Sequence, residues 1–163
     1  MEVIRQLEIS DLNSMINLRL EIQNYDLRYP GKDKTLIDEA ELEKRSRKYL
    51  EESLNDNLYL FGLFINNELV SNTGFYLEKH FPTYTNPSGL IAYICNVYTK
   101  EEYRNKGYQK KVFNYTLKYA KDMGINKFQL SSLNEKAINM YKSFGFTKKN
   151  RVYQLEVEYD KRV

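Results

Sequence analysis

Residues 90–129 contain the pattern that most restricts how this chain can fold: two apolar runs separated by a glycine turn and an amphipathic run. The first run, residues 90–99 (LIAYICNVYT), is apolar at even and odd positions, which is typical of a strand buried on both faces. Apolar residues then recur at helical spacing between Gly107 and Gly124, namely Val112, Phe113, Thr116, Leu117, Ala120 and Met123. Residues 127–131 (KFQLS) are expected to form a strand, which a right-handed crossover places parallel to the first. The pattern predicts an α/β fold with a mixed sheet.

The rest of the chain alternates between strand-like and helix-like segments, without internal repeats. We expect a strand at residues 3–9 and then a helix that Ser10 or Asp11 caps and that runs to about Tyr25. A second helix is expected from Thr35 to Leu54. The other expected elements are a hairpin of residues 57–65 and 68–77 turning at Asn66 and Asn67, a surface loop at 78–89, a short helix between Asn134 and Gly145, and strands at 146–149 and 152–159.

Size and charge indicate one domain spanning residues 1–163. A chain of 163 residues with 42% hydrophobic composition can bury about 70% of its unfolded surface. The net charge of +3 does not indicate a nucleic acid or an anionic membrane as a partner, and we expect neither. The sequence has no apolar run of about 18 residues, and its first residues do not resemble a signal peptide. With Cys95 as its only cysteine, the protein is expected to be soluble and cytoplasmic; a homodimer, the commonest assembly, is compatible with the sequence.

Basic residues gather where the strand at 90–99 leads into the following helix. They are Arg104, Lys106, Lys110 and Lys111, and they surround Gly107. A helix start has unpaired backbone N–H groups and the positive end of the helix dipole, so it is suited to a phosphate-bearing ligand. Glycine at position 107 lets such a ligand approach the backbone closely.

Two motifs in this half of the chain resemble a known family. Residues 96–110 resemble the acyl-CoA-binding motif of the GNAT superfamily of N-acetyltransferases, which reads Gln or Arg, two residues, Gly, one residue, then Gly or Ala. Arg104 and Gly107 match this motif and Gln109 does not. A second block at residues 134–146 is similar to a later family motif, with matches at Asn134, Ala137, Tyr141, Gly145 and Phe146.

The resemblance implies a GNAT-like fold: a mixed, mostly antiparallel, twisted sheet with a central parallel β-α-β unit and flanking helices. It also implies an N-acetyltransferase that moves an acetyl group directly from acetyl-CoA to an amine of a small molecule or a peptide, without a metal. Backbone N–H groups at the helix start would bind the cofactor pyrophosphate, and the residues concerned are Arg104, Asn105, Lys106, Gly107, Tyr108, Gln109 and Lys110. The side chain of Gln109 would have to turn away from the phosphates.

The same resemblance assigns residues to the acyl-transfer step. Val97 and Thr99 would bond the pantetheine arm through their backbone, and the Val97 N–H would polarise the thioester carbonyl. Asn134 would bond the cofactor from the other side. Tyr141 would lie near the sulfur and act as the general acid.

Each of these residues has a simpler interpretation. Arg104 and Lys106 fit a solvated loop, Asn134 fits a helix N-cap, and Tyr141 fits the hydrophobic core. His80, the only histidine, is a candidate general base but also fits an exposed loop, and Cys95 fits a core position.

Two other functions stay open at this stage: a non-catalytic acyl-CoA-binding or protein-interaction module of the same fold, and RNA binding through the lysine-rich helix. No metal-ligand spacing or hydrolase motif is present. The acceptor amine is not identified, although residues 23–35 and 78–90 are expected to select it.

Overall fold

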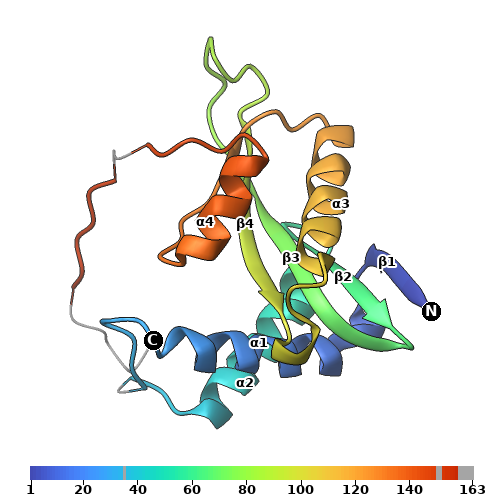
Figure 1. The fold of residues 1–163 in the computed structure, drawn as a ribbon. Coiled ribbons are helices and arrows are strands. Elements are labelled where there is room, and N and C mark those ends of the chain that lie inside the picture. The colour runs from blue at the N-terminus through green and yellow to red at the C-terminus, as the bar shows by residue number, and fades with distance from the viewer. Residues whose placement is uncertain (35, 150–151, 158–163) are drawn as a thin grey trace.

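The described residues are arranged around one five-stranded sheet (Figure 1). The structure, a computed structural model, describes residues 1–34, 36–149 and 152–157. The strands are arranged in chain order as β1 (Glu2–Gln6), β2 (Leu58–Ile65), β3 (Glu68–Lys79), β4 (Leu90–Thr99) and β5 (Phe128–Gln129). Neighbouring strands run antiparallel except β4 and β5, which run parallel. The predicted α/β class with a mixed, mostly antiparallel sheet is confirmed.

The described part of the chain forms four helices, which cover the two faces of the sheet (Figure 1). The first pair is α1 (Leu12–Asp26) with α2 (Glu39–Ser53), and the second pair is α3 (Tyr108–Asp122) with α4 (Glu135–Ser143). Short 3-10 turns at Ile9–Asp11 and Glu101–Tyr103 precede α1 and α3. Among the described residues, no helix has both the length and the apolar composition needed to cross a membrane.

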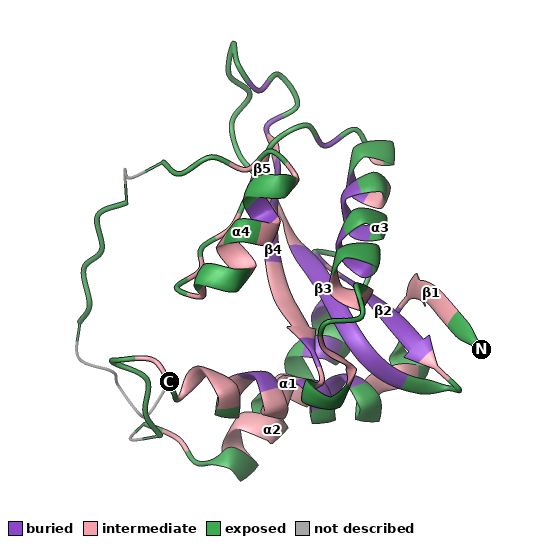
Figure 2. Cartoon of the chain, in the orientation of Figure 1, coloured by how far each residue is buried: buried purple, intermediate pink, exposed green. Residues whose placement is uncertain are grey.

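Alternation along the strands produces two separate hydrophobic cores. On β2, Leu60 faces α1 and α2 and packs with Met15 and Ile16, whereas Phe61 faces α3 and packs with Phe113. Figure 2 shows that β2 and β3 are buried along most of their length and that α3 is buried where it faces the sheet. The sheet therefore separates a face that carries α1 and α2 from a face that carries α3 and α4.

The hairpin and the β-α-β unit form as predicted, although the parallel pair β4–β5 lies at the edge of the sheet and not at its centre, and β5 is shorter than the predicted strand at 127–131. Asn66 and Asn67 form the hairpin turn with φ of 48° and 69°, a left-handed backbone that asparagine tolerates. The predicted apolar stripe of α3 is buried, apart from Met123, which is half-buried at the end of the helix. Gly124 follows with φ of 84°, as a helix-terminating glycine does.

The ends of several other elements differ from the prediction. The first strand ends at Gln6 because a capping box between Glu8 and Asp11 begins a helical turn there. The second helix begins at Glu39 rather than Thr35, which lies outside the described residues. It begins there because the Asp38 side chain accepts a hydrogen bond from the Glu41 N–H (2.8 Å) and caps the helix.

The two strands predicted after α4 are wrong within the described residues. Residues 146–149 and 152–157 have no regular secondary structure, and the rest of the second predicted strand lies outside the described part of the chain. The side chains of Val152, Tyr153, Leu155 and Val157 are 80–99% exposed. Alternation of apolar and polar residues produces a strand only where a sheet edge supplies hydrogen-bond partners. Here β5 pairs over two residues only, along β4.

Candidate active site

Strand β4 contains a bulge that the sequence pattern did not predict. Tyr98 pairs with Asn72 of β3 and Cys95 pairs with Gly74, so Asn96 and Val97 together face the single residue Thr73. Asn96 has φ of 50°, a left-handed conformation in the middle of a strand. The only available signal was an asparagine within an apolar run, since asparagine tolerates this conformation better than its neighbours.

The bulge decides which backbone groups of β4 face the open edge of the strand. The Lys100 N–H donates to the Val70 carbonyl of β3 (2.9 Å), and peptide groups alternate in direction along a strand. The peptide groups of Val97 and Thr99 therefore point away from β3. On that side β5 pairs with Ala92 and Tyr93 only, and no strand of the described chain pairs with β4 beyond them. The predicted residues Val97 and Thr99 thus lie at an edge that can accept an extended ligand, and their contact with a cofactor stays a prediction.

The loop between β4 and α3 presents a row of unpaired N–H groups. Among the described residues, none of the backbone N–H groups of residues 105–110 has a hydrogen-bond acceptor. The Arg104 N–H bonds to the Glu101 carbonyl (3.2 Å), so the row begins one residue later than the sequence predicts. Asn105 and Gly107 have φ of 61° and 78°, and such left-handed residues curve the backbone so that successive N–H groups converge. This concave row at a helix N-terminus suits an anionic group.

The Arg104 side chain is turned back toward the protein. Its Nε donates to the carbonyl of Thr99 (3.0 Å), and its guanidinium lies over the rings of Tyr25 (5.1 Å) and Tyr98 (5.3 Å). Arg104 is therefore not an ordinary solvated loop residue, because it joins the loop to the end of β4 and to α1. A direct contact between its side chain and phosphate stays a prediction.

Lys106 and Lys110 are exposed around the same row of N–H groups. Lys106 Nζ donates to the Glu102 carbonyl (3.3 Å). A lysine that no sequence motif marks, Lys136 of α4, donates to the side chain of Asn105. The loop is therefore surrounded by three lysines, one of which comes from another helix.

Gln109, the departure from the family motif, points into the protein. Its Nε2 donates to Thr73 Oγ1 (2.7 Å) and to the Asn72 carbonyl (3.2 Å). Its Oε1 accepts from Thr99 Oγ1 (2.9 Å) and from Ser71 Oγ (3.3 Å). The side chain thus fastens the first turn of α3 to β3 and β4, and it turns away from the exposed N–H row.

Asn134 and Tyr141 are placed by α4. Asn134 caps this helix, because its Oδ1 accepts from the Ala137 N–H (3.1 Å), and its Nδ2 lies 3.5 Å from the Tyr25 hydroxyl. Tyr141 is 6% exposed and packs against Phe113, with ring centroids 5.4 Å apart. Burial raises the pKa of Tyr141 to about 12. Its catalytic role stays a prediction, as does the role of Asn134 in cofactor binding.

The structure also places the other candidate residues from the sequence analysis, His80, Cys95 and the aromatic residues of the loop at 78–89. His80 lies 2.9 Å from Glu78 at the base of an exposed loop. Phe81 and Tyr84 in that loop are almost fully exposed, and Figure 1 shows the loop projecting from the end of the sheet. Burial raises the pKa of Cys95 to about 12, so this thiol stays protonated and cannot serve as a thiolate nucleophile at neutral pH. The described residues contain no group of three potential metal ligands.

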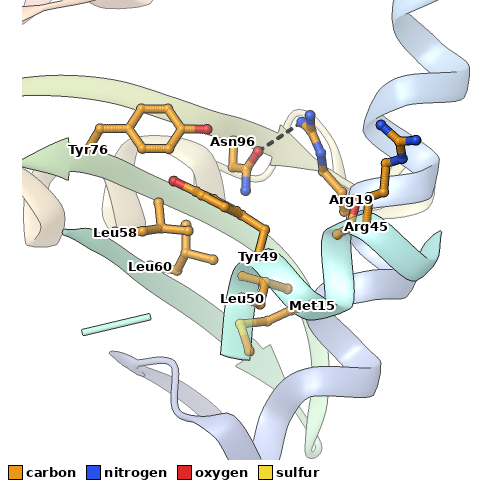
Figure 3. A pocket seen from close by; sticks show the side chains of 10 residues that line it. Met15, Arg19, Arg45, Tyr49, Leu50, Leu58, Leu60, Tyr76 and Asn96 are labelled. Atoms are coloured by element: carbon orange, nitrogen blue, oxygen red, sulfur yellow. Dashed lines mark hydrogen bonds between the residues drawn. The ribbon is translucent and has the colours of Figure 1, made fainter. Parts of the chain in front are cut away.

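A cavity of about 210 Å³ lies on the α1 and α2 face of the sheet, and the bulge residue Asn96 lines it (Figure 3). Its polar wall consists of Arg19, Arg45, Ser46, Tyr49, Tyr76 and Asn96, and its apolar wall of Met15, Leu50, Leu58 and Leu60. Arg19 Nη1 donates to Asn96 Oδ1 (3.1 Å). No sequence motif marks this cluster, because its members come from two helices and three strands.

Several known proteins resemble this chain. A curated relative, thialysine N-epsilon-acetyltransferase of Sus scrofa, is 34% identical over 64 residues, which is 38% of each chain. A predicted acetyltransferase from Clostridium acetobutylicum, crystallised with acetyl-CoA, is 23% identical with a TM-score of 0.81 over 96% of both chains. A GCN5-related N-acetyltransferase from Ralstonia eutropha JMP134 is 18% identical with a TM-score of 0.80, over 96% of this chain and 99% of that one. The model of the acetyltransferase (GNAT) family matches residues 20–146. The chain therefore belongs to the acetyltransferase (GNAT) family.

Proposed function

We propose that this protein is an N-acetyltransferase that uses acetyl-CoA as its acyl donor and transfers the acetyl group directly to an amine. The observation that carries the proposal is the row of unpaired N–H groups at residues 105–110 of the described chain, at the N-terminus of α3. These groups supply hydrogen bonds to a pyrophosphate, and the helix dipole favours its negative charge. A Cβ added to Gly107 would have no atom of the described chain within 4 Å, so the loop is open on the side from which phosphates would approach.

The open edge of β4 supports the same proposal. An extended arm of amides can pair with Val97 and Thr99 in the manner of an added strand. The carbonyl of Thr99 already accepts from Arg104, so its N–H is the group left for the arm. The carbonyl of Val97 and its N–H both face the open edge, and the N–H can stabilise negative charge on the thioester oxygen.

The transfer forms a C–N bond between the amine nitrogen and the acetyl carbon while the C–S bond breaks. The amine loses one proton, and the departing sulfur gains one. Tyr141 is the proposed proton donor to this sulfur. With a pKa of about 12, the Tyr141 hydroxyl is protonated at neutral pH and therefore has a proton to donate. Transfer to a thiolate, whose conjugate acid titrates at about pH 8.5 in free cysteine, is uphill in water, so proximity and the local field have to favour it.

A matched pair of glycine variants tests the phosphate site. Gly107 and Gly124 flank the two ends of α3 with φ of 78° and 84°, and at neither would an added Cβ meet an atom of the described chain within 4 Å. Alanine therefore introduces the same backbone strain at both sites. We expect G107A to weaken acetyl-CoA binding in isothermal titration by at least about tenfold, because only its Cβ meets the phosphates, and G124A to change it little. Equal affinities of the two variants would contradict the phosphate site.

Turnover separates the enzyme from a binding module of the same fold. Release of the CoA thiol from acetyl-CoA, measured over a panel of amines, is expected for an enzyme. Acetyl-CoA binding without thiol release on any amine would favour the non-catalytic module instead. A cytoplasmic location, a homodimer, and the absence of nucleic-acid and membrane partners stay predictions from the sequence.

A further inference from the structure

The cavity beside the β4 bulge has the position of an acceptor site. Asn96 lines the cavity, and the next residue, Val97, carries the N–H proposed to polarise the thioester. The cofactor loop at the start of α3 and the cavity lie on opposite faces of the sheet. An amine bound in the cavity would thus reach the bulge from the face opposite the phosphate site. Figure 3 shows Arg19, Asn96 and Tyr76 gathered around this space.

The cavity contains a cation without a counter-ion. Arg19 is half-buried, and none of the described carboxylates lies within 4 Å of its guanidinium. Arg19 Nη1 donates to Asn96 Oδ1 (3.1 Å), and with the Gln23 amide in its favoured orientation the Gln23 oxygen accepts from Nη1 (3.2 Å) and Nη2 (3.3 Å). Two of the five N–H donors of the guanidinium, one on Nη2 and the one on Nε, are left for another group. A partly buried charge is unfavourable unless it is paired, so a guanidinium in a cavity suits an anionic ligand.

The other residues of the cavity do not neutralise this charge. Arg45 contributes a second guanidinium, which pairs with Glu41 of the same helix (2.7 Å). None of the described residues that line the cavity is an aspartate or a glutamate. Burial raises the pKa of Tyr76 in the wall and of the adjacent Cys95 to about 12, so both are neutral at pH 7.

The size and the apolar wall limit what the cavity can hold. Its volume of about 210 Å³ lies below the range of about 300–1,000 Å³ that is usual for ligand pockets, which suits a small ligand of amino-acid size. Met15, Leu50, Leu58 and Leu60 supply an apolar surface for methylene groups. A polyamine or another acceptor with several positive charges would meet the Arg19 guanidinium and no carboxylate among the described lining residues.

We infer that the acceptor is a small amine that also carries an oxyanion, a carboxylate or a phosphate, which Arg19 binds while the amine faces Val97. The inference rests on the proposed acetyl transfer and adds the acceptor class. Carboxylates and phosphates both match the paired donors of a guanidinium, so the experiment has to distinguish between them.

A series of matched acceptors tests the inference. The series comprises linear ω-amino carboxylic acids with one to five methylene groups, their primary amides, diamines of the same lengths and aminoalkyl phosphates. Thiol release from acetyl-CoA gives kcat/KM for each compound. At the optimal length we expect either the acid or the phosphate to exceed the amide by at least about tenfold, since a charge-assisted contact is lost in the amide. The better of the two identifies the oxyanion.

One variant and its control test whether Arg19 causes the preference for the anionic acceptor over its amide. R19Q should reduce the ratio of kcat/KM between the anionic acceptor and its amide by about tenfold. R47Q is the control for the loss of a guanidinium as such, because Arg47 of α2 does not line the cavity and pairs with Glu43. R47Q should keep the wild-type ratio. Acetyl-CoA titration and thermal unfolding establish that each variant is folded.

A binding measurement keeps the test independent of turnover. With CoA present, which has no acetyl group to transfer, the anionic acceptor at tenfold above its Kd should raise Tm by about 3–6 °C, and the amide should not. Equal or faster turnover of amides or diamines would overturn the acceptor inference while leaving acetyl transfer in place, and so would an unchanged ratio in R19Q. Acetyl-CoA binding with neither thiol release nor a Tm shift from any compound would overturn both proposals.

Discussion

Replacing Gln109 with alanine should destabilise the protein by about 2 kcal/mol. The Gln109 amide makes four hydrogen bonds that join the start of α3 to β3 and β4, at 2.7, 2.9, 3.2 and 3.3 Å. A typical hydrogen bond contributes about 0.5–1.5 kcal/mol net to folding. The two short bonds are at the middle of that range and the two long ones at its lower end, which gives about 3 kcal/mol.

The partners of Gln109 reduce this loss, because they also bond to one another. Ser71 and Thr99 share a hydrogen bond of 2.7 Å, and Thr73 Oγ1 donates to the Asn72 carbonyl (2.9 Å). None of the four partners is left without a bond in the variant. Alanine also has a slightly better helix propensity than glutamine. These two effects lower the expected loss to about 2 kcal/mol.

Urea unfolding followed by circular dichroism measures this change. In thermal unfolding, a loss of about 2 kcal/mol should lower the Tm of a chain of this length by about 4–8 °C. Lys118→Ala, on the exposed side of the same helix, is the control and should change the free energy of unfolding by less than about 0.5 kcal/mol. A double-mutant cycle with Thr73→Ala should give a coupling energy of about 1 kcal/mol, because the two side chains form the shortest of the four bonds.

The acetyl-CoA affinity of Gln109→Ala distinguishes between the family motif and the structure more clearly than stability does. By the family motif alone, a small residue at position 109 should improve cofactor binding. The structure predicts the reverse, because the Gln109 side chain lies against the sheet, where its removal opens no space for phosphates and loosens the loop that presents the N–H groups. Tighter binding of acetyl-CoA by Gln109→Ala, or a loss of stability below about 0.5 kcal/mol, would refute this reasoning.

Three further predictions concern the cofactor loop, the general acid and alkaline stability. Arg104→Ala should raise the Kd of acetyl-CoA by about tenfold or more without unfolding the protein, because it removes the bond to the Thr99 carbonyl; unchanged affinity in titration would exclude this role. Tyr141→Phe should lower kcat about 100-fold with little change in KM, and a near-normal kcat where chemistry limits the rate would make Tyr141 a packing residue. Burial raises the pKa values of Tyr76, Cys95 and Tyr141 to about 12, so above pH 9 the unfolded chain ionises first and stability should fall, by up to about 1.4 kcal/mol per pH unit per group, until pH 12. Urea unfolding from pH 8 to 11 should show a shallower fall between pH 9 and 10 in Cys95→Ala, and parallel curves would contradict the assigned shift.

The elements predicted correctly are those whose cause is local. Residues 90–129 carry a helical stripe between two glycines, and the hairpin turns at adjacent asparagines with positive φ. Spacing and turn chemistry decide such elements almost alone. The motifs at residues 96–110 and 134–146 also located the loop before α3 and the helix α4, because the residues of each motif are close together in the sequence.

The failed predictions required knowledge of which segments become neighbours. The alternation at 152–159 describes a strand well, but a strand also requires an edge, and β5 is only two residues long. Predicting the cavity would have required knowledge of both long-range neighbours and a local backbone irregularity. Arg19 and Asn96 are 77 positions apart in sequence, and the asparagine reaches the arginine only because the bulge gives it a left-handed backbone. Neither hydrophobic periodicity nor a sequence motif predicts a contact between two such distant residues.

Three of the residues predicted to bind the cofactor make side-chain contacts that hold the loop and α4 in shape. Arg104 bonds the end of β4, Gln109 bonds β3 and β4, and Asn134 caps α4. Besides the lysines around the loop, the groups left to meet a ligand are backbone N–H groups, which every residue type except proline supplies. Affinity for the cofactor should therefore depend on how rigidly the sheet holds residues 105–110, and less on which side chains they carry. The proposed site is therefore compatible with the departure from the family motif at Gln109: an inward amide that makes four hydrogen bonds restrains the loop where the family uses a small residue.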